Sequence, residues 1–199
     1  MANTSIINGF KPVRHLDGTP YNGGYNRYYK GTTAGILCVG DPVIALTASS
    51  DPLGGAEIVR ATTSGAITGV IVGFDPTTSN LHKSGYYLAA DTGYLYVCDD
   101  PFVMYEVAET NSTGGAGTPL AITNIRNYIN SCTAINGNTT LGVSNYSIDN
   151  GSYGTSTGTW RLERLVQRAD NAVGSYAKWL VSVALSTQVG DSALTESAV

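Results

Sequence analysis

The stretch YLYVCDDPFVMYEV (residues 94–107) contains the pattern that decides the fold. Two runs of aromatic and branched residues, 94–98 and 102–107, are typical of β-strands. The turn-forming sequence Asp99-Asp100-Pro101 separates them. Similar short apolar runs, ended by Gly, Pro, Asn or Asp, recur from Thr33 onward at intervals of about ten residues, as in β-sandwiches and barrels. We therefore predict an all-β fold with a single jelly-roll-like sandwich or barrel over residues 33–186.

Three stretches within or after this domain carry weaker signals. Residues 111–158 are rich in Thr, Ser, Asn and Gly, so we expect an insertion or a set of hairpins at the rim. Inside it, Pro119 follows Thr118 in a pattern that predicts a short helix over residues 119–129. The small and polar tail, residues 187–199, is predicted to be flexible.

The last strands are the most strongly patterned. Residues 160–167 alternate in polarity, which favours a strand over the helix that the same residues also permit. Residues 177–185 place Trp179, Val181 and Val183 on one face of a second strand. Further upstream, Asp91-Thr92-Gly93 predicts a hairpin between residues 86–88 and 94–98.

Residues 1–32 are predicted to form an extended N-terminal arm, because apolar residues are sparse there and Asn-Gly and Asp-Gly pairs interrupt any period. The arm contains Tyr21, Tyr25, Tyr28 and Tyr29 among Asn, Gly and basic residues. Tyrosine offers a large contact area and a polar tip, which suits a contact surface. Wrapping around its own domain and gripping a neighbouring molecule both remain open for this segment.

Charge is unevenly distributed along the chain. The formal net charge is −4, but residues 1–30 carry +3 and residues 41–120 carry −7. A sequence pI near 5.0 argues against nucleic acid as a partner of the whole domain. The basic N-terminal segment instead suits an acidic surface on another protein.

No enzyme signature is present. The chain has two histidines, His15 and His82, and lacks the serine-hydrolase, metalloprotease and nucleotide-binding motifs. Three widely spaced cysteines fit no zinc or redox motif, so we expect reduced thiols in the core, with a Cys38–Cys98 bridge as the alternative. Asp99-Asp100 suits a hard cation, although a strand break explains the pair more simply. We therefore expect no catalysis, cofactor or metal, and the apolar runs are too short for a membrane span.

Three segments resemble parts of the small virion proteins encoded beside the major capsid protein in tailed bacteriophages. They are GFKPVRHL (residues 9–16) with the tyrosine-rich stretch that follows, VCDDPFVMYEV (97–107), and DNAVG with AKWLV (170–181). Residues 111–158 have no counterpart. The resemblance implies a capsid cement, decoration or head-fibre protein without catalytic residues or cofactor. It also implies synthesis in the host cytoplasm, a place on the virion surface, and a dimer or trimer on the symmetry axes of the capsid.

The resulting hypothesis is a structural subunit that binds the major capsid protein and stabilises the phage head. Its expected contacts with the capsid or a neighbouring copy are Arg14, Tyr25, Arg27, Tyr28 and Tyr29. The alternative is a glycan-binding or host-adhesion module, such as a fibre head, because exposed aromatic residues beside Asn and Asp also form sugar-binding surfaces. A hydrolase with an unrecognised site is the third possibility.

Overall fold

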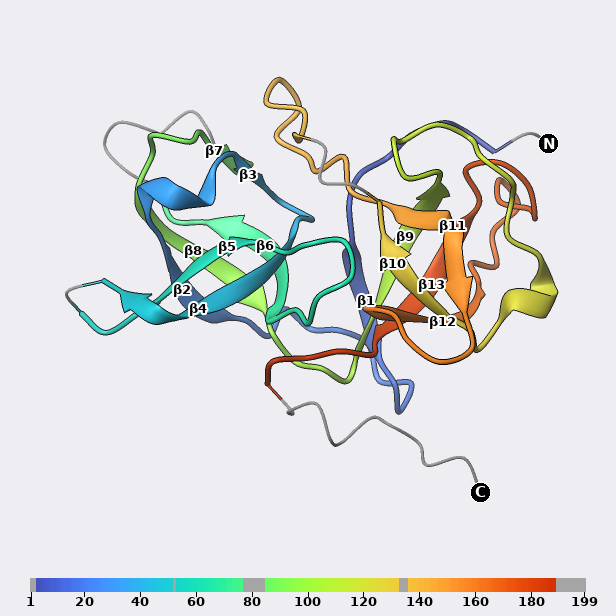
Figure 1. Ribbon diagram of the computed structural model, residues 1–199, viewed down its shortest axis with the longest axis horizontal. Coiled ribbons are helices and arrows are strands. Elements are labelled where there is room, and N and C mark those ends of the chain that lie inside the picture. Colours follow the sequence, from blue (N-terminus) through green and yellow to red (C-terminus); the bar gives the residue numbers. More distant parts are fainter. Residues whose placement is uncertain (1–2, 52, 77–84, 133–135, 189–199) are drawn as a thin grey trace.

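The computed structural model describes residues 3–51, 53–76, 85–132 and 136–188, and Figure 1 shows two lobes built from strands. Strands account for 43% of the chain and helices for 4%, which confirms the all-β prediction. Each lobe is a sheet that closes on itself. The predicted sandwich or barrel class is thus confirmed, with two small barrels in place of one, and the chain passes between them at residues 16–25 and again at residues 99–102.

The first barrel takes the middle of the sequence. It contains β2 (Asn26–Lys30), β4 (Pro42–Ser50), β5 (Ala56–Arg60), β6 (Gly69–Phe74) and β8 (Gly93–Cys98), closed in the order β2-β5-β4-β6-β8. A 3-10 turn, η1 (Thr32–Ala34), and a two-stranded sheet of β3 (Leu37–Cys38) and β7 (Tyr86–Tyr87) lie beside it. Branched side chains such as Val43, Ile58 and Leu95 are fully buried inside.

The second barrel is formed mainly by the C-terminal half. Its strands are β1 (Lys11–His15), β9 (Val103–Thr110), β10 (Tyr128–Ser131), β11 (Ile148–Gly154), β12 (Trp160–Leu165) and β13 (Lys178–Val183). They follow the order β1-β9-β11-β10-β12-β13, and β13 also pairs with β9, so that the sheet closes. Trp160 and Trp179 fill the interior, and Phe10 stacks on Trp160 with ring centroids 4.1 Å apart.

The two barrels share a buried contact. The apolar cluster around the tryptophans also includes Ala61, Ile67, Val70 and Cys98 from the first barrel. Next to it, β6 and β8 approach so closely that position 69 has room only for glycine, because a Cβ atom there would collide with the backbone carbonyl of Cys98. Apolar burial of this kind holds the two barrels together as one body.

Residues 1–32 are not a separate arm, which corrects the prediction. β1 pairs antiparallel with β9, and β2 is a barrel strand between β8 and β5. Lys30 is fully buried, and its Nζ donates hydrogen bonds to the carbonyls of Gly31, Ala89 and Asp91. Partner strands supply the apolar packing that this segment lacks in its own sequence, so local composition did not reveal it.

Residues 111–158 are also not a separate insertion, because β10 and β11 are members of the closed second sheet. The predicted helix at 119–129 is reduced to one 3-10 turn, η2 (Ile122–Asn124), since Tyr128 and the residues after it pair in β10 instead. The predicted hairpin is wrong as well: β7 pairs with β3, and β8 pairs with β2 and β6.

The strand assignment at 160–167 is confirmed by β12, and that at 177–185 by β13. Of the tail, Thr187 and Gln188 are held: the Thr187 hydroxyl lies 2.9 Å from that of Thr68, and Gln188 donates to Tyr28. Residues 189–199 lie outside the described residues. His82 lies outside them too.

Candidate binding surfaces

The outer side of β2 and β8 is a tyrosine-rich surface on the first barrel. Antiparallel register places Arg27 opposite Tyr96 and Tyr29 opposite Tyr94. The alternate residues of β8, Leu95 and Val97, point into the core and are fully buried. Period-two alternation therefore directs the tyrosines and Arg27 outward together. We call Tyr25, Arg27, Tyr29, Tyr94 and Tyr96 the tyrosine face.

Contacts within the tyrosine face fix its side chains. The Arg27 guanidinium carbon lies 3.7 Å from the centroid of the Tyr94 ring, in cation–π geometry. The rings of Tyr25 and Tyr96 are 4.6 Å apart, and those of Tyr29 and Tyr94 are 5.7 Å apart. Each ring thus has an aromatic or cationic neighbour, so the face is already ordered before any partner binds.

Two carboxylates accept hydrogen bonds from the polar groups of the tyrosine face. Asp75 accepts hydrogen bonds from the Tyr96 hydroxyl and from Nε and Nη2 of Arg27, the latter two at 3.2 and 2.8 Å. Asp51 accepts from the Tyr94 hydroxyl. The hydrogen bond to Asp51 raises the pKa of Tyr94, and the one to Asp75 raises the pKa of Tyr96. Both phenols therefore remain neutral hydrogen-bond donors around neutral pH.

Of the five predicted contact residues, Tyr25, Arg27 and Tyr29 lie on this face. Tyr28 points the other way: its ring packs against the first core, and its hydroxyl donates to Asp99 at 2.8 Å. Burial is the main cause that raises the pKa of Tyr28. Arg14 lies on the second barrel, in β1.

The prediction missed Tyr94 and Tyr96, together with the carboxylates Asp51 and Asp75. The alternation in Tyr94-Leu95-Tyr96-Val97 was the available signal, because it places both tyrosines on the face of the strand opposite to the core. The pairing of β8 with β2, which lies some seventy residues earlier in the chain, could not be seen from spacing alone.

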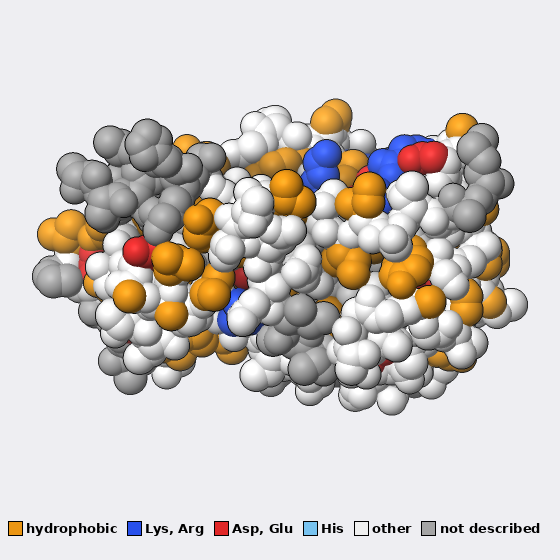
Figure 2. Space-filling model, turned by 90° about the horizontal axis from the view of Figure 1, so that it is seen from above, with side chains coloured by type: hydrophobic (Ala, Val, Ile, Leu, Met, Phe, Trp, Pro, Cys, Tyr) orange, Lys and Arg blue, Asp and Glu red, His pale blue; other side chains and the backbone are white. Residues whose placement is uncertain are grey.

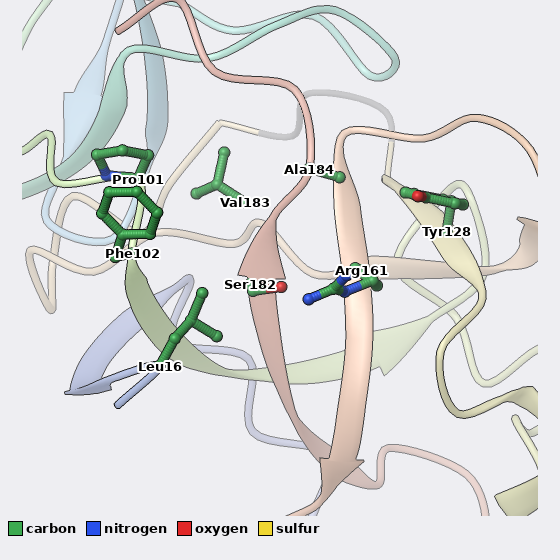
Figure 3. Close-up of a pocket in the computed structure, with 8 residues that line it drawn as sticks. All are labelled: Leu16, Pro101, Phe102, Tyr128, Arg161, Ser182, Val183 and Ala184. Carbon is green, nitrogen blue, oxygen red and sulfur yellow. The ribbon is translucent and has the colours of Figure 1, made fainter. Parts of the chain in front are cut away.

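A second surface lies on the outer side of the second barrel. Four arginines line a hollow there together with Asp17 and Glu163: Arg14, Arg126, Arg161 and Arg164. Next to it is a smaller apolar pocket that shares Leu16 and Arg161 with the hollow (Figure 3). Phe102, Pro101 and Leu16 stand on one side of this pocket, and Arg161 and Tyr128 on the other (Figure 3).

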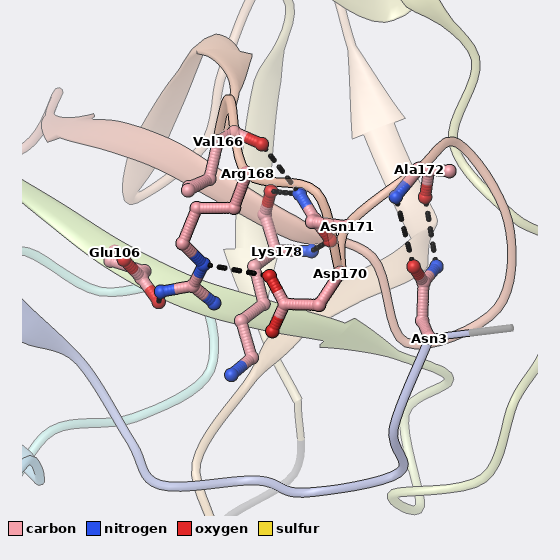
Figure 4. A network of polar contacts seen from close by, with 8 residues as sticks. All are labelled: Asn3, Glu106, Val166, Arg168, Asp170, Asn171, Ala172 and Lys178. Carbon is pink, nitrogen blue, oxygen red and sulfur yellow. Dashed lines mark hydrogen bonds and ion pairs between the residues drawn. The ribbon is translucent and has the colours of Figure 1, made fainter. Parts of the chain in front are cut away.

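Further along the same outer side, a polar network ties the N-terminal segment to the connector before β13 (Figure 4). Asn3 exchanges two hydrogen bonds with the backbone of Ala172, and Asn171 bonds to the backbone of Val166 and Lys178. Arg168 pairs with Glu106 at 3.0 Å and with Asp170 at 3.2 Å. These contacts give the DNAVG sequence a structural role.

On the face shown in Figure 2, uncharged polar and backbone atoms dominate, and hydrophobic side chains are scattered over it. Asp99 binds Asn26 and Tyr28, and Asp100 pairs with His15 at 3.2 Å. In the described ranges, no group of three or more His, Cys, Asp or Glu side chains is arranged to hold a metal ion.

The three cysteines are free and buried. Burial raises the pKa of the Cys38 thiol to about 12 and also raises those of Cys98 and Cys132. None of them is therefore an activated nucleophile. The two helical elements of the described chain are short 3-10 turns, far from the length of a membrane-spanning helix.

Comparison with known proteins finds no matching family model, no matching curated protein and no matching solved structure.

Proposed function

We propose that this chain is a structural protein of a bacteriophage head, a cement or decoration subunit that binds the major capsid protein through the tyrosine face. The observation that carries the proposal is the ordered set of tyrosines around Arg27. Tyrosine and arginine are enriched among the residues that dominate protein–protein affinity. The resemblance of three segments to phage capsid-associated proteins indicates the kind of partner.

The ordering of the tyrosine face favours binding. A flexible arm would lose roughly 1–2 kcal/mol of backbone entropy per residue on docking. Residues 26–30 are already paired in β2, and the side chains of Tyr25, Arg27 and Tyr29 already have neighbours. Preorganised surfaces of this kind leave more of the contact energy available for affinity.

The resembling segments lie together in the fold. Residues 9–16 contain β1, residues 97–107 lead into β9, and residues 170–181 lead into β13; β9 pairs with both β1 and β13. These segments thus pair with one another in the second barrel, and the tyrosine-rich stretch that follows residues 9–16 leads into β2 of the first barrel, which carries the tyrosine face. Self-association as a dimer or trimer would let weak contacts add up on a symmetric shell.

The test is co-sedimentation of the purified chain with empty shells of the major capsid protein. The wild-type chain should sediment with the shells, and Tyr25→Ala should weaken binding about tenfold or more, as for an aromatic contact residue that dominates the affinity. Tyr153→Ala is the matched control, because Tyr153 is 50% exposed, like Tyr25 at 55%, but lies on β11. Failure of the wild-type chain to bind shells, or equal loss in both variants, would contradict the proposal.

A glycan-binding module is the second candidate, because Asp51 and Asp75 place carboxylates beside the rings of Tyr94 and Tyr96. Stacking on aromatic rings with hydrogen bonds to carboxylates is a chemistry that sugars can use. Glycan-array binding that is lost in Tyr96→Ala, with no sedimentation alongside shells, would favour this candidate over the capsid protein.

A further inference from the structure

Basic residues gather on the outer side of the second barrel. Seven of the eleven Lys and Arg residues line two neighbouring hollows beside β1 and β9: Lys11, Arg14, Arg126, Arg161, Arg164, Arg168 and Lys178. Four acidic residues accompany them: Asp17, Glu106, Glu163 and Asp170. The difference, 7 − 4, gives this side +3 in a chain whose net charge is −4. Such a separation of charge favours an acidic partner on this side.

The larger hollow, of about 460 Å³, is an arginine cleft lined by Arg14, Arg126, Arg161 and Arg164. Glu163 forms ion pairs with two of these arginines, since its carboxylate lies 3.3 Å from Arg126 and 2.9 Å from Arg161. Burial alone would raise the pKa of Glu163, but hydrogen bonds from Ser182 and Arg161 and the charge of Arg126 hold it below its usual value. Glu163 is therefore ionised at neutral pH and already engaged.

Arg14 and Arg164 are the two arginines of the cleft that do not pair with Glu163. Within the described residues neither guanidinium group makes a hydrogen bond or an ion pair, and the Nε atom of Arg14 is buried without a partner. Arg164, by contrast, is exposed. A buried donor without an acceptor costs roughly 1–3 kcal/mol, so an anionic group that enters the cleft gains more than it would at an ordinary surface arginine.

The apolar pocket beside the cleft limits the kinds of molecule that could supply this anionic group. Phe102 is 55% exposed and Leu16 is 42% exposed, and both line the pocket. Figure 3 shows that Arg161 reaches the same pocket from the opposite side. A ligand that fills both the arginine cleft and the apolar pocket must present carboxylates and an apolar side chain close to one another. A small inorganic anion cannot do this.

We propose that the arginine cleft and its apolar pocket bind an acidic peptide segment of a partner protein, one that carries a Leu- or Phe-like side chain next to its carboxylates. Carboxylates of the segment pair with Arg14 and Arg164, and the apolar side chain enters the pocket against Phe102. Charge complementarity selects this occupant. Nucleic acid is disfavoured, since Asp17 and Glu163 would face its phosphates.

This proposal does not depend on the function proposed above, because the cleft and the tyrosine face lie on different barrels. Each can fail while the other holds. The two surfaces also differ in salt dependence. Arg27 is already paired with Asp75, whereas Arg14 and Arg164 would form their pairs only on binding, so peptide affinity should fall steeply as salt is added.

The test measures fluorescence anisotropy of a labelled peptide, Gly-Glu-Glu-Leu-Glu-Gly, with the full-length protein. Two comparison peptides replace every Glu by Gln or the Leu by Gly, and both should bind more weakly. Arg164→Ala removes an exposed guanidinium and should weaken binding about tenfold, the effect of one charge-assisted pair. Arg14→Gln should do the same, and because Arg164 is exposed, its variant remains informative even if Arg14→Gln disturbs folding.

Arg168→Ala is the matched control, since it removes the same charge from the same side of the barrel but from a guanidinium already paired with Glu106 and Asp170. Binding in this variant should stay within about twofold of the wild type. The proposal is overturned by an equal loss in Arg168→Ala, by indifference to the Leu-to-Gly change, or by stronger binding of inorganic phosphate or of a single-stranded oligonucleotide. Binding between copies of this chain in place of the peptide would overturn it as well.

Discussion

Replacing Glu109 by Gln should make the protein more stable at about pH 8 and leave its stability nearly unchanged at about pH 4. Glu109 is fully buried in β9, inside the second barrel. Its Oε2 atom accepts hydrogen bonds from the backbone N–H of Leu120 at 3.0 Å and from the indole N–H of Trp179 at 3.1 Å. Its Oε1 atom has no hydrogen-bond partner within the described residues.

Burial raises the pKa of Glu109 from 4.5 to about 7, against the two hydrogen bonds that lower it. Below pH 4.5 the carboxyl is protonated in both the folded and the unfolded chain, so it has no effect on stability. Between that value and about 7 the unfolded chain loses its proton first, and the free energy of unfolding falls as pH rises. A shift of this size corresponds to about 3 kcal/mol.

Glutamine cannot ionise, and its amide oxygen can still accept from Leu120 and Trp179. Its NH₂ group, however, takes the place of the unpartnered Oε1 atom, which costs part of the gain. Glu109→Gln should therefore raise the free energy of unfolding by roughly 1–3 kcal/mol at about pH 8. Asp41, whose pKa burial raises to about 6, keeps a smaller slope of the same sign in the variant.

The assay is urea unfolding followed by tryptophan fluorescence at several pH values between about 4 and 8. Trp160 and Trp179 both lie in the core of the second barrel, so they report its unfolding directly. The wild-type chain should lose stability as pH rises, and the variant should lose much less. A variant that is less stable than the wild type at about pH 8, or that keeps the full pH dependence, would refute the reasoning.

Three further changes test the packing and the connector. Phe10→Ala should lower the free energy of unfolding by about 3–5 kcal/mol, because the ring is 1% exposed and stacks on Trp160; thermal unfolding measures this, and a change below about 1 kcal/mol would contradict the assigned core. Gly69→Ala should cost several kcal/mol or prevent soluble expression, since the added Cβ meets the Cys98 carbonyl, and a normally stable variant would place this strand pairing in doubt. Asn171→Ala should cost about 1–2 kcal/mol by removing its side-chain hydrogen bonds to the backbone. Backbone amide hydrogen exchange in this variant should become faster first in the connector before β13. Unchanged protection there would show that Asn171 does not hold the connector in place.

The patterned strands were predictable because each one carries its signal locally. In β12, alternation of large apolar residues with polar ones marks the buried face without knowledge of the partner strand, and in β13 large apolar residues at every second position, Trp179, Val181 and Val183, do the same. The outward-facing residues Tyr25, Arg27 and Tyr29 were recognised for a similar reason, since a tyrosine-rich and basic stretch stands out by composition. Tyr28 was misplaced because composition alone does not show which side of a strand is buried.

The closure of two barrels was decided only in three dimensions. β2 has few apolar residues of its own and becomes a strand because β8 and β5 provide its hydrogen bonds, and β11 closes the second barrel through a short parallel contact with β9. The same pairing brings Asp51 and Asp75 to the tyrosine face and gathers arginines from β1, β12 and the η2–β10 connection around one cleft. Local sequence therefore determined that this chain forms strands with defined inner faces. Which strands meet, and hence which polar side chains share a surface, depended on long-range hydrogen bonds and burial that no local pattern encodes.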